Sequence, residues 1–122
     1  MKLIRMSRRE GKTTRLIKES SDTGAIIICP VKRSIELIKE AAKEMELEIP
    51  DPMTIDEYIE KFGKYNKDCP KNPPILIDDI ERVLEIYLRT KILSSTTSCE
   101  IEIPKFDIMQ GYENEKDRFK RI

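Results

Sequence analysis

The chain has 122 residues, of which 39% are apolar and 38% charged, so it has room for one compact domain with a lean core and a heavily charged surface. Its 23 Lys and Arg residues balance its 23 Asp and Glu residues. The zero net charge argues against a protein dedicated to coating DNA or RNA, which would be basic overall.

The sequence contains no histidine, which excludes histidine-based acid–base chemistry, His-dependent nucleophiles and most zinc sites. Its cysteines Cys29, Cys69 and Cys99 are widely spaced and odd in number, which indicates reduced thiols rather than a disulfide framework. No apolar run is long enough to cross a bilayer, and the N-terminus lacks an apolar signal-peptide core. We therefore expect a soluble cytoplasmic protein with no membrane partner.

The first half of the chain predicts two strand–helix pairs. Residues 2–6 predict a short strand, and residues 12–20 a helix that ends in a polar turn over 20–24. Residues 25–29 form a continuous, mostly β-branched run, which is typical of a strand buried on both faces. Pro30 ends this strand, and residues 32–46 then predict an amphipathic helix, with apolar residues at helical spacing: Ile35, Ile38, Ala42 and Met45.

The second half continues the alternation. Thr54 and Glu57 fit a capping box that opens a short helix, and residues 63–74 predict a loop. Residues 75–77 predict a buried strand that ends in two carboxylates, and a helix follows to about residue 93. The last predicted element is a half-exposed strand near an edge, formed by residues 99–103.

This order of strands and helices predicts an α/β domain with a mostly parallel sheet. Ligands of such sheets bind beyond the carboxyl ends of the strands. Two polar clusters of this chain follow predicted strands, one after residue 6 and the other after residue 77. Both clusters are therefore candidate parts of a binding site.

The first cluster, residues 6–14, matches the second half of the phosphate-binding pattern G-x-x-x-x-G-K-[ST]. Gly11 lets the backbone approach phosphate oxygens, Lys12 is placed to neutralise them, and the Thr13 hydroxyl is suited to Mg²⁺. Met6 stands where the pattern has its first glycine. The alternative interpretation is a chance helix start with a threonine cap.

The second cluster is Asp78-Asp79, which directly follows the predicted strand of residues 75–77. Asp78 is suited to hold Mg²⁺, and either Asp79 or Glu81 to position or deprotonate an attacking water molecule. The alternative interpretation is a helix N-cap, because Asp is common at helix starts.

These motifs together resemble the P-loop NTPases, in particular phage terminase ATPase domains, related helicase-like domains and small phage-type P-loop proteins. The resemblance rests on the loop, on Cys29-Pro30 after the second strand, on the Leu47 to Thr54 segment and on the acidic strand end. It implies a minimal three-layer domain of about five strands over residues 1–104. It also implies ATP and Mg²⁺ as cofactors, with Thr13 and Asp78 as ligands of the metal. The resemblance is to the division of P-loop NTPases that carries a catalytic acid directly after the metal-binding Asp, and Asp79 stands where that division usually has Glu. The phosphate-binding residues that it implies are Ser7, Arg8, Arg9, Glu10, Gly11, Lys12, Thr13 and Thr14.

The resemblance leaves three functions open. The first is an ATP-binding protein with slow hydrolysis that acts with DNA-associated protein partners, located in the host cytoplasm if phage-encoded. The second is a degenerate P-loop protein that binds or regulates another protein without NTPase activity. A small-molecule or nucleotide kinase is the third and ranks last, because no insertion between the motifs is long enough for a lid apart from the Pro-rich residues 63–74.

Two further sets of residues have open interpretations. The charged segment 105–122 predicts a surface helix or a mobile tail, in which Arg118 and Arg121 are either arginine fingers toward a neighbouring subunit or solvated side chains. Tyr58 and Phe62 are suited to stack on a base, but their helical spacing favours the core.

Overall fold

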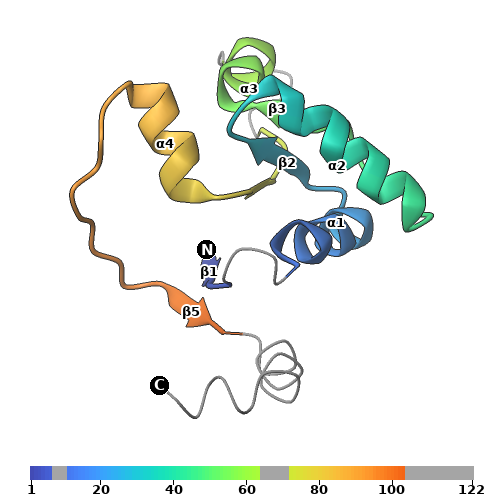
Figure 1. The fold of residues 1–122 in the computed structure, drawn as a ribbon, viewed down its shortest axis with the longest axis horizontal. Coiled ribbons are helices and arrows are strands. Elements are labelled where there is room, and N and C mark those ends of the chain that lie inside the picture. Colours follow the sequence, from blue (N-terminus) through green and yellow to red (C-terminus); the bar gives the residue numbers. More distant parts are fainter. Residues whose placement is uncertain (7–10, 64–71, 104–122) are drawn as a thin grey trace, which may run out of the picture. The chain divides into compact units, whose positions relative to one another are not determined.

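The computed structural model describes residues 1–6, 11–63 and 72–103 (Figure 1). The chain divides into two compact units, one with Met1–Lys12 and Ser95–Ile122, and the other with Thr13–Ser94. We call these unit 1 and unit 2. The predicted loop residues Ser7 to Glu10, Cys69 and the segment 105–122 with its two arginines lie outside the described residues.

Unit 2 contains a parallel sheet of three strands in the order β3-β2-β4. The central strand β2 (Ile26–Cys29) is buried along its whole length, as its β-branched sequence predicts. Ile28 pairs with Met53 of β3 (Met53–Thr54) on one side and with Ile77 of β4 (Ile75–Ile77) on the other. The strands are parallel, so their carboxyl ends meet at one edge of the sheet. The sequence did not predict the two-residue strand β3.

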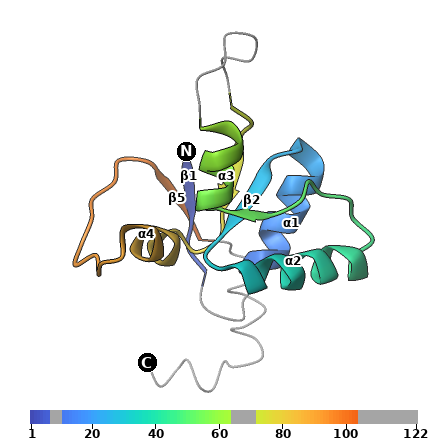
Figure 2. The same cartoon turned by 90° about the horizontal axis from the view of Figure 1, so that it is seen from above.

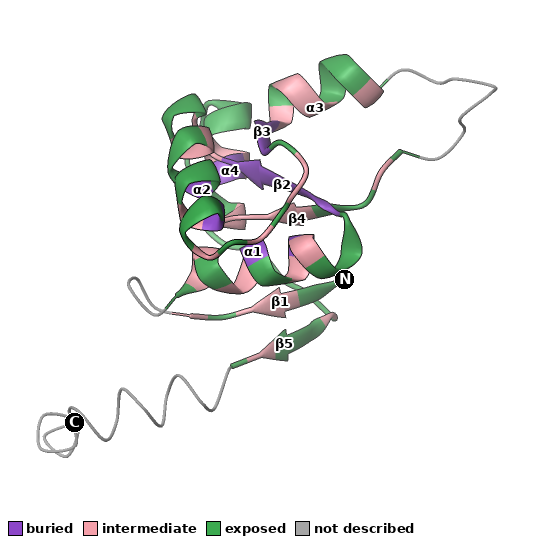
Figure 3. Cartoon of the chain, turned by 90° about the vertical axis from the view of Figure 1, so that its right-hand side faces the viewer, coloured by how far each residue is buried: buried purple, intermediate pink, exposed green. Residues whose placement is uncertain are grey.

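Helices cover both faces of β2 (Figure 2). Helices α1 (Lys12–Thr23) and α2 (Lys32–Glu44) pack on the face that presents Ile27 and Cys29. Helices α3 (Ile55–Phe62) and α4 (Ile80–Leu88) pack on the other face, where Val83 contacts the cluster formed by alternate residues of β2. The buried residues gather on β2 and on the inner sides of the helices (Figure 3). An α/β fold with parallel strands is thus confirmed. The predicted sheet of about five strands is not found, because the strands of the described residues form one sheet of three and a separate sheet of two.

The prediction that residues 20–24 form a turn is wrong for most of that stretch, because α1 continues to Thr23. Its hydroxyl side chains stabilise the last turn. The buried Ser20 hydroxyl donates to the Ala25 carbonyl oxygen at 2.6 Å, and the Thr23 hydroxyl donates to the Glu19 carbonyl oxygen at 2.8 Å. These bonds keep polar side chains compatible with a helix end that packs on the core.

The prediction of a helix to residue 93 is also wrong, because α4 ends at Leu88. Arg89 adopts a left-handed conformation with φ of 57°, which ends the helix. The Glu85 carboxylate then accepts a hydrogen bond from the Ile92 backbone N–H at 2.8 Å and fixes the segment that follows. The strand β4 is less buried than expected, since Ile75 remains 38% exposed.

Unit 1 contains a two-stranded parallel sheet of β1 (Lys2–Ile4) and β5 (Glu100–Glu102). The Lys2 ammonium and the Glu102 carboxylate form an ion pair at 2.8 Å beside it. The half-exposed character predicted for the last strand is confirmed, since Ile101 is 53% exposed. Among the described residues of the whole chain, no helix has the length and apolar content that a membrane crossing requires.

Candidate functional site

The start of α1 is the first candidate part of a site. Gly11 directly precedes the helix and adopts a positive φ of 89°, a conformation that glycine reaches without a steric penalty. Lys12 is the first helical residue, and the first turn carries no acidic side chain. The N–H groups of that turn have no partner within the helix, so the backbone and the helix dipole favour an anion here.

Lys12 and Thr13 are half-buried, and Thr14 is exposed. A strand precedes the helix as predicted, with β1 ending at Ile4 and α1 beginning at Lys12. However, among the described strands β1 pairs with β5 in a sheet of its own and is not paired with β2 or β4. A strand before and a helix after are the context that the phosphate-binding motif requires.

The second candidate part is the carboxyl edge of the β3-β2-β4 sheet. The Asp78 backbone N–H donates to the Ile28 carbonyl oxygen at 2.9 Å, which extends the pairing of β4 by one residue. The half-buried Asp78 carboxyl group therefore sits on a backbone held by the central strand.

Asp79 occupies the N-cap position of α4 in a left-handed conformation, with φ of 62° and ψ of 74°. Its side chain makes no capping hydrogen bond, so capping does not explain an aspartate here. A non-glycine residue in this region is strained, and such strain is often found at functional sites. Glu81 lies in the first turn of α4 and is exposed.

Two further residues, Cys29 and Glu57, lie at this edge of the sheet. Cys29 ends β2 with a fully buried side chain, and its thiol donates a weak hydrogen bond to the Met53 carbonyl oxygen at 3.6 Å. The pKa of the Cys29 thiol is raised from 9.0 to about 11. Burial is the largest cause, and the negative charges of Asp78 and Glu57 contribute to the same rise. Both carboxylates therefore act on the same thiol, from opposite neighbours of β2.

The capping box at the start of α3 explains where Glu57 is held. The Glu57 carboxylate accepts hydrogen bonds from the Thr54 N–H at 3.0 Å and from the Thr54 hydroxyl at 3.1 Å, and the Glu57 N–H donates to the same hydroxyl at 3.4 Å. The Thr54 N–H is the main reason that the pKa of Glu57 is lowered, helped by the Thr54 hydroxyl and the Lys32 ammonium. Glu57 is thus anionic and fixed beside the carboxyl edge.

Sequence reasoning identified Asp78 and Asp79 but missed Glu57, whose charge acts together with that of Asp78 on the Cys29 thiol. No sequence signal could have shown this, because the strand order brings Cys29, Thr54 and Asp78 to one edge of the sheet and the short strand β3 was not predicted. The prediction of reduced thiols is confirmed for Cys29 and Cys99, which are both free.

The described residues at this edge provide too few ligand side chains to bind a metal ion by themselves. Within the described ranges 1–6, 11–63 and 72–103, no group of three or more Cys, Asp or Glu side chains is placed to hold a metal. Magnesium commonly uses one or two carboxylates together with water and substrate phosphates. The Asp78 carboxylate is a group of this kind.

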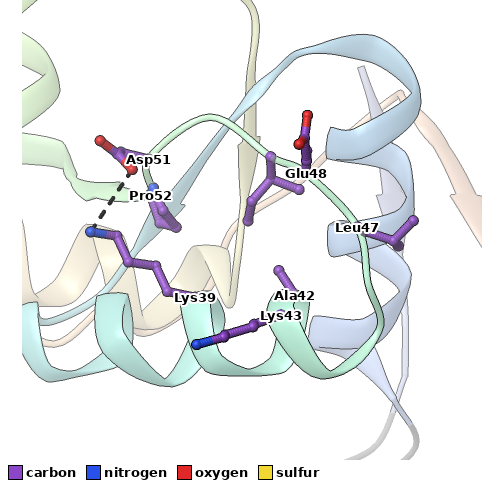
Figure 4. A pocket seen from close by; sticks show the side chains of 8 residues that line it. Lys39, Ala42, Lys43, Leu47, Glu48, Asp51 and Pro52 are labelled. Atoms are coloured by element: carbon purple, nitrogen blue, oxygen red, sulfur yellow. Dashed lines mark ion pairs between the residues drawn. The ribbon is translucent and has the colours of Figure 1, made fainter.

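A separate open hollow of about 410 Å³ lies between α2 and residues 47–52 (Figure 4). Its buried floor includes Ala42 and Pro52, and the exposed Lys39 and Asp51 side chains form an ion pair at 3.8 Å across its rim. None of the predicted site residues lines it. The hollow is therefore not part of the candidate site.

Tyr58 and Phe62 belong to the core rather than to a base-stacking surface. Their rings lie 5.1 Å apart and pack against the cluster around Ile28 and Val83. The Tyr58 hydroxyl also donates to the Pro73 carbonyl oxygen at 2.8 Å, which ties α3 to the start of β4. The interpretation that helical spacing favours the core is confirmed.

No protein-family model, curated protein or solved structure matches the chain. Function is therefore inferred from the chemistry of the residues at the start of α1 and at the carboxyl edge of the sheet in unit 2.

Proposed function

We propose that this protein binds a nucleoside triphosphate, ATP in the first instance, together with Mg²⁺, through a P-loop. The observation that carries the proposal is the left-handed Gly11 immediately before α1, whose first turn contains a lysine and no acidic residue. The first N–H groups of any helix have no partner within the helix, which favours an anion at this end. Glycine is required there by the backbone, and lysine and threonine follow it in the order that phosphate binding needs.

The oxygen donors of Thr13 and Asp78 match the ligand preference of Mg²⁺. In the proposed complex, Lys12 and the N–H groups of α1 bind the phosphates, while the Thr13 hydroxyl and the Asp78 carboxylate hold the metal. The hydrogen bond from Asp78 to Ile28 supports this role, because it fixes the backbone that carries the carboxylate. The bound Mg²⁺ would supply charge neutralisation to the phosphates.

Slow hydrolysis is the activity we assign to the complex, with Asp79 as the residue that positions the attacking water. Asp79 is half-buried, conformationally strained and not used as a side-chain cap, whereas Glu81 is exposed on α4. These differences favour Asp79 over Glu81. A carboxylate within reach of the water would act as its hydrogen-bond acceptor and take up its proton.

Calorimetric titration and thermal shift with ATP, with and without Mg²⁺, test the proposal on three proteins: wild type, Lys12→Ala and Lys18→Ala. Lys18 lies on the same helix, is exposed and serves as the matched control. A ligand at 100 times its Kd stabilises the native state by about 2.7 kcal/mol. We expect a Mg²⁺-dependent shift in wild type and Lys18→Ala that is lost in Lys12→Ala. Absence of any shift in wild type at millimolar ATP would overturn the nucleotide proposal.

The second candidate function is a degenerate P-loop protein that binds another protein. The apolar surface of α4 and the segment after it favours this alternative, since Ile86, Tyr87, Leu88 and Leu93 are 44%, 42%, 56% and 91% exposed. The two functions separate on Lys12→Ala and Asp78→Asn. An NTPase loses turnover in both variants while it keeps its fold, whereas a binding module keeps its partner. Nucleic acid enters either proposal only through such partners, and a cytoplasmic location stays a prediction.

A further inference from the structure

We draw no further inference here: the strongest candidate, the partly exposed apolar face of α4 formed by Ile86, Tyr87 and Leu88 together with the neighbouring Leu93, is already the basis of the alternative function, and nothing in the structure shows what covers it.

Discussion

The buried thiol of Cys29 should make the stability of the protein depend on alkaline pH. In the folded chain the pKa of this thiol is about 11, against an ordinary value of 9.0. Between these values the unfolded chain loses the proton while the folded chain keeps it. The free energy of unfolding therefore falls as pH rises through this window, and Cys29 has no effect below it.

The size of the effect follows from the shift. One pKa unit corresponds to about 1.4 kcal/mol, so Cys29 should lower the free energy of unfolding by about 1.4 kcal/mol at pH 10 and by about 2.7 kcal/mol well above pH 11. Urea unfolding followed by circular dichroism at pH 8 and pH 10 measures this loss in wild type, Cys29→Ala and Cys29→Ser. Both variants should lose less stability than wild type over this interval, by about 1.4 kcal/mol. Other groups that titrate there are present in all three proteins and cancel in the comparison.

Two variants keep the test valid if one of them folds poorly, because alanine leaves a small cavity and serine buries a hydroxyl group. An identical pH dependence in wild type and in both variants would refute the assigned burial of the thiol. Asp78→Asn then tests the electrostatic part. Removing that charge should lower the pKa of Cys29 without restoring its ordinary value, because burial is the larger cause. An unchanged pH profile in Asp78→Asn would show that Asp78 does not act on the thiol.

Three further predictions test features of the helix ends, and a fourth substitution, Arg82→Gly, serves as a control. Asp79→Gly should keep ATP binding and stability, because glycine adopts φ of 62° freely. The same change should reduce the rate of hydrolysis by about 10² or more. A wild-type rate of hydrolysis in a steady-state assay would exclude Asp79 from the reaction. Arg89→Gly should raise the free energy of unfolding by about 0.5–1 kcal/mol, because it relieves a left-handed residue at the end of α4, whereas Arg82→Gly inside the same helix should lower it by about 1 kcal/mol. Equal effects of these two changes in urea unfolding would contradict the assigned helix end. Thr54→Ala should destabilise the protein by about 1 kcal/mol in urea unfolding, and an unchanged stability would argue against the capping box. The pKa of Glu57, followed by carboxyl NMR titration, should rise only part of the way to its ordinary value, because the Thr54 N–H that is the main cause of its lowering remains in the variant.

Much of the fold is local in origin and could be predicted. The run Ile26 to Cys29 could only be a doubly buried strand, and Thr54 with Glu57 specified a helix start through bonds three residues apart. The errors concern helix ends, where residues adopt a conformation that their usual propensities do not predict. Ser20 is a turn residue by composition, but a bond to Ala25 lets α1 pass through it. Helical spacing after Leu88 suggested continuation, and only the left-handed Arg89 ends the helix.

The candidate site was predictable in its residue types but not in its neighbours. Gly11, Lys12 and Asp78 stand out because their chemistry follows a recognised spacing. Glu57 is far from Asp78 in the sequence, and it reaches the same thiol only because β3 and β4 flank β2 in parallel. Strand order is a tertiary property, so no local pattern near Glu57 predicts that its charge acts on Cys29 together with that of Asp78.

The pairing of β1 with β5 has a consequence for how the chain folds as it is synthesised. The ion-paired Lys2 and Glu102 are 100 positions apart, so β1 leaves the ribosome long before its partner exists. Unit 2 is one continuous stretch, Thr13–Ser94, and it can form its own contacts during that interval. A pairing of such long range carries a loop-closure entropy cost before its contacts form, so we expect β1 and β5 to pair after unit 2 has begun to fold. A nascent chain released after Ser94 would therefore carry a foldable unit 2 and a strand β1 whose parallel partner was never made.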